Sequence, residues 1–202
     1  MTPRAAPMSP DDRRRAILDA VIPLIVETGE APSTKQIAVA AGIAEGTIFR
    51  VYPDKASLMM AVAAEAISPR EGEAAFDAML AEVPDLRGRV ERAAVSLTDQ
   101  MHRAMKVMFA VRRQLVPESG ETRNPKGPPQ FILRANRELL TMLTRLFEPY
   151  RDQLTMPPET AAVVLRSLVF GSRHPGMQIA ADLTPEQIAD VIIDGVVKKE
   201  TP

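Results

Sequence analysis

The chemistry that this sequence offers is hydrogen bonding and charge, not bond breaking. Its 202 residues include no cysteine and only two histidines, His102 and His174. Neither histidine has a partner at metal-ligand spacing. The sequence also lacks a nucleophile elbow, a phosphate-binding loop, a paired-histidine motif and a carboxylate dyad. We therefore expect no enzyme, no cofactor and no metal site, and we interpret both histidines as surface or hydrogen-bonded structural residues.

The most informative stretch runs from Ser33 to Lys55 and reads STKQIAVAAGIAEGTIFRVYPDK. Ser33 and Gln36 form a capping box, which predicts the start of a helix. Gly42 is a natural left-handed end for that helix, and a second helix is predicted from about Glu45 to Val51. Two helices joined by about three residues that include a glycine are typical of a helix-turn-helix, whose second helix can enter the major groove of DNA.

This stretch resembles the DNA-binding segment of the TetR family of bacterial transcriptional regulators. The resemblance rests on IA-x-x-AG-I, GTIFR-x-Y and P-D-K-x-x-L, in that order, at the family's spacing and near the N-terminus. Each fragment alone is weakly specific, but the ordered set is specific, and the length of the chain also fits the family. The resemblance implies a set of DNA-contacting residues: Ser33, Lys35, Glu45, Gly46, Thr47, Phe49, Arg50 and Lys55.

These roles agree with the chemistry of the side chains. Gly46 has no side chain, so its helix can approach the bases closely, and Thr47 can exchange hydrogen bonds or contact a thymine methyl group. Glu45 could accept a hydrogen bond from a cytosine amino group, but a stabilising carboxylate at the helix N-terminus is the interpretation that we favour. The cations also have a plain alternative, which is that they are solvated surface residues: Lys35, Arg50 and Lys55.

Two positions depart from the family pattern. Phe49 stands where a tyrosine is usual, so a phosphate contact through a hydroxyl group is lost, and Ala44 replaces a common Ser or Thr. The base preference therefore cannot be read from relatives. Near the N-terminus, Arg4 and Arg13–Arg15 either contact phosphates or belong to the solvated start of the first helix.

The remaining pattern predicts an all-α chain of about nine helices. Apolar residues recur at steps of three and four, and no strand pattern of useful length is present. We expect an N-terminal three-helix helix-turn-helix domain over residues 1–58 and a larger C-terminal helical bundle over residues 59–202. A long helical pattern begins at Asp85 and is predicted to break between Met101 and Met108. Residues 117–130 have the composition of a loop.

Charge and hydropathy narrow the setting of the protein. A formal net charge of -1 gives no hint of nucleic acid, although a small local patch is enough for DNA binding. No apolar run approaches the roughly 18 residues that span a bilayer, and the N-terminus lacks an apolar signal segment. The absence of cysteine suits a reducing compartment, so we expect a cytoplasmic protein that contacts no membrane.

The resemblance further implies that the larger domain binds a small-molecule effector and dimerises through Pro158–Arg173 and Thr184–Lys198. The candidates for an apolar pocket are Leu97, Met101, Met105, Met108, Phe131 and Met142, although a methionine stripe at helical spacing is more often ordinary core. Possible polar anchors are Arg112, Asn136, Arg166 and His174. The candidates for the dimer interface are Val164, Leu168, Gly171, Ile188, Val191, Ile192 and Gly195.

The leading hypothesis is a homodimeric repressor that binds a palindromic operator in double-stranded DNA and is released by an effector of unknown identity. The alternative is a helical adaptor that uses its helix-turn-helix for protein contacts.

Overall fold

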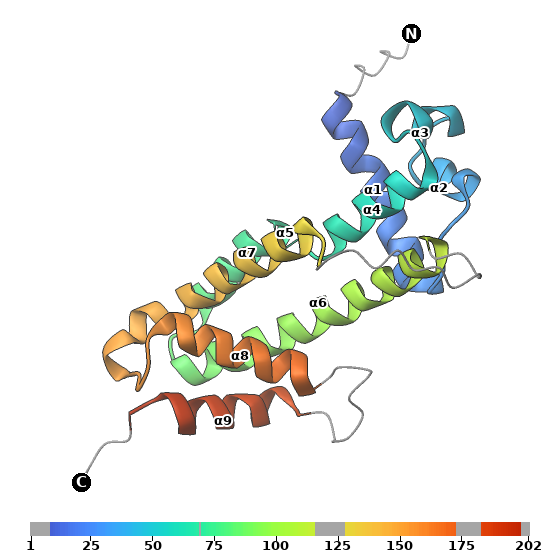
Figure 1. Cartoon of the computed structure of the whole chain (residues 1–202). Coiled ribbons are helices and arrows are strands. Elements are labelled where there is room, and N and C mark those ends of the chain that lie inside the picture. Colours follow the sequence, from blue (N-terminus) through green and yellow to red (C-terminus); the bar gives the residue numbers. More distant parts are fainter. Residues whose placement is uncertain (1–8, 69, 116–127, 173–182, 199–202) are drawn as a thin grey trace. The chain divides into compact units, whose positions relative to one another are not determined.

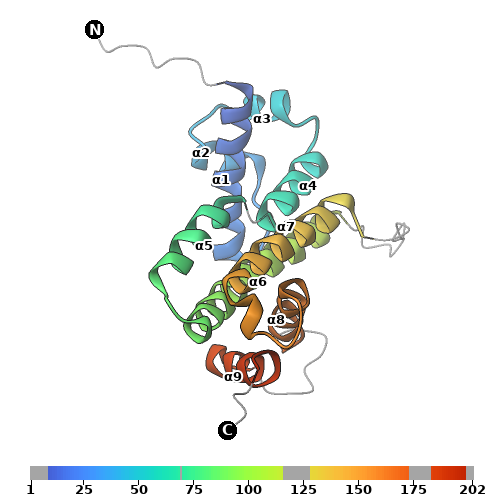
Figure 2. The same ribbon diagram turned by 90° about the vertical axis from the view of Figure 1, so that its left-hand side faces the viewer.

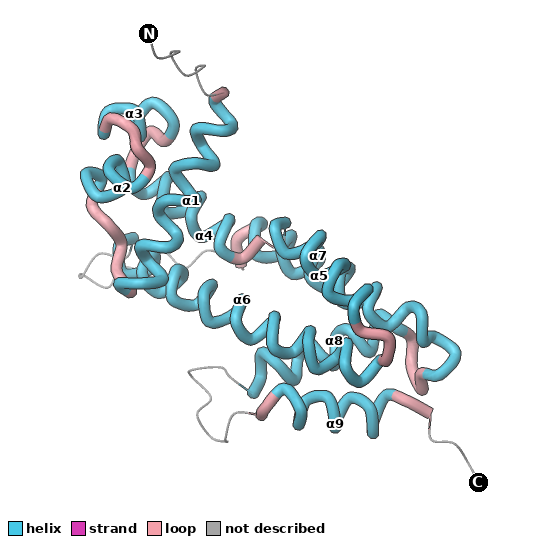
Figure 3. The backbone as a smooth tube through the Cα atoms, turned by 180° about the vertical axis from the view of Figure 1, so that it is seen from behind, coloured by secondary structure: helices cyan, strands magenta, loops and turns pink. Residues whose placement is uncertain are grey.

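The computed structural model describes residues 9–68, 70–115, 128–172 and 183–198. Within these ranges the chain forms nine α-helices and one 3-10 helix and no strand (Figures 1 and 3), which confirms the predicted all-α fold. No helix of the described ranges combines the length and the apolar character that crossing a bilayer requires. The elements are α1 (Pro10–Thr28), α2 (Thr34–Ala40), α3 (Glu45–Val51), α4 (Lys55–Ala66), α5 (Arg70–Glu82), α6 (Leu86–Leu115), α7 (Gln130–Phe147), η1 (Glu148–Gln153), α8 (Pro158–Ser172) and α9 (Pro185–Val196).

Several helices begin and end where the local sequence dictates. The side chains of Ser9, Ser33, Asp54 and Thr184 each accept a hydrogen bond from the backbone N–H three residues further on. A cap of this kind stabilises its helix by about 1 kcal/mol. Gly29 ends α1 in the left-handed conformation with φ 73°. The capping signals in the sequence therefore set the starts of α1, α2, α4 and α9.

The first compact unit comprises the described residues of Met1–Ile67 and Arg103–Lys126. In this unit α1 packs against α2, α3 and α4 (Figure 2). The apolar residues of each helix lie three or four positions apart, so they share one face and meet in a common core. The fully buried side chains of this core include Ile17, Val21, Ile25, Ile37, Ile48, Leu58, Met59 and Val62.

The second unit comprises the described residues of Ser68–His102 and Gly127–Pro202. In it α7 packs against α8, and α8 lies beside α9 (Figure 1). The backbone N–H of Thr155 donates to the carbonyl oxygen of Val196 at 2.7 Å, which joins the segment before α8 to the end of α9. Fully buried side chains of this unit include Val90, Leu143, Leu146, Phe147, Leu165, Val169, Ile188 and Ile192.

Helix α6 runs without interruption, so the predicted break between Met101 and Met108 is wrong. The segment from Arg89 to Leu115 contains neither glycine nor proline, and most of its residues have good helix propensity. The boundary between the two compact units falls between His102 and Arg103, so α6 supplies residues to both. The division into domains at residue 58 stays a prediction, and residues 117–127 of the predicted loop lie outside the described residues.

Candidate nucleic-acid interface

The turn between α2 and α3 is closed by backbone hydrogen bonds around Gly42. Gly42 adopts φ 64°, a conformation that residues with a Cβ atom rarely adopt. The N–H of Ile43 then donates to the carbonyl oxygen of Ala38 at 3.0 Å, and the N–H of Ala41 donates to that of Ile37 at 2.9 Å. The predicted left-handed end at Gly42 is confirmed, and these bonds set the direction in which α3 leaves α2.

Helix α3 presents one solvent-exposed face. Ile48 is buried in this helix, which packs against α1 and α2, while Glu45, Gly46, Phe49 and Arg50 are exposed. Because residues four apart lie on the same side of a helix, Glu45 is above Phe49, and Gly46 is above Arg50. Four predicted DNA-contacting residues therefore share one surface, and Phe49 keeps 46% of its area exposed there. Thr47 is half-buried at the edge of this face.

Ser33 is the N-cap residue of α2, and Lys35 lies in the first turn of this helix. The hydroxyl group of Ser33 donates to Oε1 of Gln36 at 2.8 Å and accepts from the backbone N–H of the same residue at 3.3 Å. This hydroxyl is therefore already engaged in the capping box and would have to turn to meet a phosphate. Lys35 is exposed, and α2 carries no acidic residue in its first turn. The positive end of the helix dipole and the lysine thus add to one another.

Lys55 is the first residue of α4 and is half-buried. A cation at this end of a helix is unfavourable for the folded chain, because the free N–H groups carry the positive end of the dipole, but it is favourable for an anion that binds there. Asp54 caps the helix, and its carboxylate accepts from the backbone N–H of Ser57 at 2.6 Å. This hydrogen bond and a second one from the Ser57 hydroxyl lower the pKa of Asp54. The carboxylate of Asp54 therefore stays ionised at neutral pH and remains bound to the start of α4.

A hydrogen bond that the sequence does not reveal joins α2 to α3. The hydroxyl group of Thr34 donates to Oε1 of Glu45, although the two residues are 11 positions apart. Thr34 was not among the predicted site residues, because no sequence pattern relates residues at this distance. The bond connects the first residue of the capped helix to the first residue of the helix that faces outward.

Arg14 also has a partner that sequence reasoning missed. Its Nη2 donates to the carbonyl oxygen of Val51 at 3.3 Å, and the carbon at the centre of its guanidinium group lies 5.4 Å from the centroid of the Tyr52 ring. Arg14 is exposed, so both interpretations of the basic cluster at the start of α1 stay predictions for it, and Arg4 of this cluster lies outside the described residues. Arg14 binds the C-terminal end of α3 and so helps to hold the exposed helix in place.

The predicted effector pocket has a mixed outcome in burial. Leu97 and Met142 are buried members of the apolar core of the second unit, and Met101 is also buried. The others are half-buried: Met105, Met108 and Phe131. Because core burial alone does not distinguish a pocket from packing, this pocket stays a prediction.

Two of the possible polar anchors are unusual in their surroundings. Nε of Arg166 and Oδ1 of Asn136 are buried in the second unit and have no hydrogen-bond partner among the described residues. The guanidinium group of Arg166 lies over the ring of Phe170, with 5.0 Å to the ring centroid. Arg112 is exposed, and His174 lies outside the described residues. Buried polar atoms without partners are costly, so these two atoms are candidates for binding water or a ligand.

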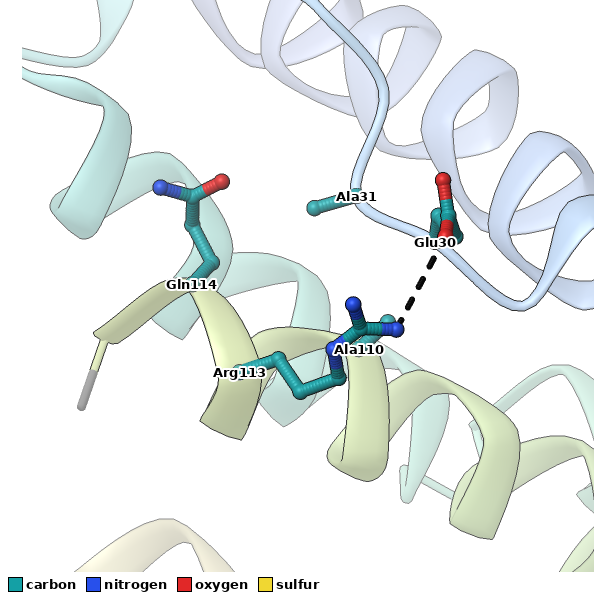
Figure 4. A pocket seen from close by; sticks show the side chains of 5 residues that line it. All are labelled: Glu30, Ala31, Ala110, Arg113 and Gln114. Atoms are coloured by element: carbon teal, nitrogen blue, oxygen red, sulfur yellow. Dashed lines mark ion pairs between the residues drawn. The ribbon is translucent and has the colours of Figure 1, made fainter. Parts of the chain in front are cut away.

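A small hollow lies within the first unit and is lined by none of the predicted pocket residues. Figure 4 shows that two of its lining residues form an ion pair, with 3.7 Å between Nη1 of Arg113 and Oε1 of Glu30. Its volume is about 190 Å³, and it is open to solvent. Small-molecule pockets usually have roughly 300–1,000 Å³ and enclose most of the ligand. The lining residues are Glu30, Ala31, Ala110, Arg113 and Gln114.

The dimer candidates divide by their exposure. Ile188 and Ile192 are fully buried in their own chain, so their side chains leave no surface for a second copy. Val191 on α9 is 49% exposed, and Val163 on α8, which the sequence did not single out, is 45% exposed. Helical periodicity alone does not say which apolar side of α9 faces inward. Of the other candidates, Val164 and Leu168 are half-buried, and Gly171 and Gly195 are exposed with open space around them.

The described ranges hold no group of three or more His, Asp or Glu side chains that could bind a metal ion.

The predicted DNA-contacting residues all lie in the first unit. They lie at the cap of α2, on α2, on α3 and at the start of α4.

Solved structures share this arrangement of helices, whereas no family model matches the sequence. A candidate TetR-family transcriptional regulator from Mesorhizobium loti superposes with a TM-score of 0.65 at 16% sequence identity, over 95% of this chain and 100% of that chain. A TetR transcriptional regulator from Streptomyces coelicolor gives a TM-score of 0.57 at 19% identity, over 91% and 98% of the two chains. The superantigen PfiT gives 0.59 at 20% identity, over 96% and 100%. The chain therefore has the fold of the TetR-family transcriptional regulators.

Proposed function

We propose that the protein is a sequence-specific DNA-binding transcriptional regulator of the TetR family. The observation that carries this proposal is the exposed face of α3, with Gly46, Phe49 and Arg50, in a helix-turn-helix that also carries Lys35 and Lys55. A helix of this kind fits the major groove, and cations beside it contact the phosphates on either side. No arrangement of side chains in the described residues suggests catalysis, so we infer that the protein is not an enzyme.

The fold alone does not carry the proposal, because a protein named as a superantigen has it too. The residues of α2–α4 are what favours DNA. The adaptor hypothesis has one observation in its favour, which is that Val39 is 76% exposed and Phe49 is also exposed on the same small unit. Apolar groups on a surface suit a protein partner, but Phe49 can equally contact a sugar or a thymine methyl group.

Enrichment of a randomised double-stranded DNA library on the full-length protein tests the proposal. We expect enrichment of a palindrome with half-sites about one helical turn apart, because a dimer presents two helices α3. Lys35→Ala and Lys55→Ala should weaken binding to all sequences alike and reduce the slope of log K against log salt by about 0.9 for each lost phosphate contact. Absence of any enriched sequence, or affinity that does not depend on salt, would contradict the proposal.

We further infer that an effector acts through α6 and that the protein is a repressor released by it. Helix α6 supplies residues to both compact units. In the first unit, Nζ of Lys106 donates to the carbonyl oxygen of Val26 at 3.1 Å, near the end of α1, and Arg113 pairs with Glu30. An effector that binds the protein better with α6 in one position than in another would change the fraction of molecules whose helix-turn-helix fits the operator.

Fluorescence anisotropy of a labelled operator duplex tests this second step. A panel of small molecules is added to the complex, and an effector lowers the anisotropy of the duplex. Lys106→Ala should leave the affinity for DNA within about 3-fold but reduce the response to the effector, since it removes a contact of α6 and not of DNA. If no compound of a broad panel, including extracts of the host, changes the anisotropy, release by an effector is not supported.

A further inference from the structure

We propose that Thr34 is a positioning residue for Glu45 and that this pair makes the protein select a C·G base pair in each half-site. The inference rests on the proposed DNA-binding function and names the base that one part of its surface reads. It also revises the interpretation of Glu45 from the sequence, where a carboxylate that only stabilises its helix was favoured.

The two residues begin the two helices of the helix-turn-helix. Thr34 is the first residue of α2 and Glu45 is the first residue of α3. The Thr34 hydroxyl donates to Oε1 of Glu45, and within the described residues no ion pair engages this carboxylate. Glu45 is exposed on the same face as Phe49, one residue before Gly46. One oxygen is therefore held by the protein, and Oε2 is left to accept from another donor.

The restraint on Glu45 comes from Thr34 because its neighbours supply none. Ala44 precedes it and makes no side-chain capping bond, and Gly46 follows it without a side chain. A glutamate side chain has several rotamers of similar energy, and ordering them costs up to about 2 kcal/mol. A hydroxyl bound to Oε1 removes much of this freedom before DNA binds. Preorganisation of this kind improves both affinity and discrimination.

The chemistry of a carboxylate then decides which base fits. Ionised glutamate only accepts hydrogen bonds. In the major groove cytosine offers its N4 amino group as a donor, whereas guanine offers the acceptors N7 and O6, and thymine offers the acceptor O4 and a methyl group. Adenine has a donor at N6 but an acceptor at N7 beside it, which repels the carboxylate. Cytosine is therefore the base that matches Oε2, and any other base leaves a negative charge facing an acceptor.

Enrichment of a randomised duplex library on full-length protein variants tests the assignment. Wild type should prefer cytosine at one position of each half-site by about 10-fold, the usual scale of a direct base contact. Glu45→Gln should lose this preference and favour adenine at the same position, because an amide can bind N6 and N7 together. Thr34→Val keeps the shape of the side chain but lacks the hydroxyl, so the preference should broaden at that position alone.

Two further variants separate positioning from general damage. Thr34→Ser retains a hydroxyl group and should restore the preference of the wild type. Lys35→Ala, the matched control on the same turn, should keep every base preference but reduce the dependence of affinity on salt. Thr34→Val should leave that dependence unchanged, since it removes no phosphate contact.

The outcomes are distinguishable. If wild type enriches no sequence, the proposed DNA-binding function fails and the inference falls with it. If wild type enriches a palindrome but Glu45→Gln has the same preference at every position, the function stands and the inference is overturned. Should Thr34→Val prove unfolded by circular dichroism, Glu45→Gln decides whether Glu45 reads the base, and Thr34→Ser and Thr34→Ala are compared to decide the role of the hydroxyl. If those two variants match at every position, the positioning role is overturned.

Discussion

The guanidinium group of Arg14 lies over the ring of Tyr52, with 5.4 Å between its central carbon and the ring centroid. The same group donates to the carbonyl oxygen of Val51 at 3.3 Å. One residue of α1 thus satisfies a carbonyl group at the end of α3 and covers the aromatic residue that follows it. The exposed helix of the candidate interface is therefore held at its C-terminal end by Arg14, just as its N-terminal end is joined to Thr34.

Replacing Arg14 should destabilise the first compact unit without altering the exposed side chains of α3. Arg14→Ala removes a cation–π contact and a hydrogen bond, and we expect the free energy of unfolding to fall by about 1–2 kcal/mol. Arg15→Ala is the matched control, because Arg15 is an exposed neighbour on the same helix, and its effect should stay within about 0.5 kcal/mol. Urea denaturation followed by circular dichroism measures both, and equal losses in the two variants would show that the contacts of Arg14 contribute nothing.

The first compact unit should become less stable in alkali because of Tyr52. Burial raises the pKa of the phenol above its ordinary value of 10.0, and the nearby Arg14 only partly offsets this. Above pH 10 the unfolded chain releases the phenol proton while the folded chain keeps it, so unfolding becomes more favourable as the pH rises. The melting temperature should therefore fall less steeply between pH 8 and pH 11 in Tyr52→Phe than in wild type. Parallel curves for the two proteins would contradict the prediction.

Two glycines of the helix-turn-helix should respond oppositely to alanine. Neither has an atom within 4 Å of an added Cβ, but Gly42 has φ 64° and Gly46 has helical backbone. Gly42→Ala should cost about 1–2 kcal/mol of stability through strain. Gly46→Ala should raise stability by up to about 1 kcal/mol through helix propensity, yet weaken DNA binding, because a methyl group separates the helix from the bases. Melting curves and operator titrations check both, and a Gly46→Ala variant that binds as tightly as wild type would place this residue away from the DNA.

Removing the hydroxyl group of Thr98 should stabilise the second unit. Thr98 is 7% exposed, and its Oγ1 has no hydrogen-bond partner in the part of the chain that the structure describes. Thr98→Val keeps the shape of the side chain and should add about 1 kcal/mol to the free energy of unfolding, since an unpaired buried hydroxyl is costly. Thr144→Val is the control, because the Thr144 hydroxyl donates to the carbonyl oxygen of Leu140 at 2.9 Å. It should be neutral or destabilising. If Thr98→Val is the less stable variant, its hydroxyl binds a partner.

A charge at the exposed side of α9 should dissociate the proposed homodimer. Val191 is half-exposed, whereas Ile192 beside it is fully buried. Val191→Glu places a charge on an apolar surface and should shift the protein from dimer to monomer in analytical ultracentrifugation. Val95→Glu on α6 is a matched change at a comparably exposed valine and should leave the dimer intact. A wild type that is monomeric at micromolar concentration would contradict the dimer itself, and a dimeric Val191→Glu would place the interface elsewhere.

Sequence alone determined the local elements of this protein. Ser33 with Gln36, Gly42 and Asp54 act on backbone groups at most four positions away, so the order of residues is enough to predict the helix-turn-helix. The all-α fold follows in the same way, because a repeat of three and four places apolar residues on one face of a helix wherever that helix packs. The predicted break in α6 failed for the opposite reason, since length alone does not interrupt a helix that lacks glycine and proline.

Tertiary structure alone decided which residues meet across the chain. Thr34 and Glu45 are 11 positions apart, and Arg14 and Val51 are 37 positions apart, so no periodic pattern relates them. The same holds for Ile188 and Ile192, which are apolar at helical spacing and are fully buried in the core of their own chain. Periodicity shows that a helix has an apolar side, but only packing against its neighbours decides which atoms that side contacts, because the free energy of burial depends on area and not on sequence order.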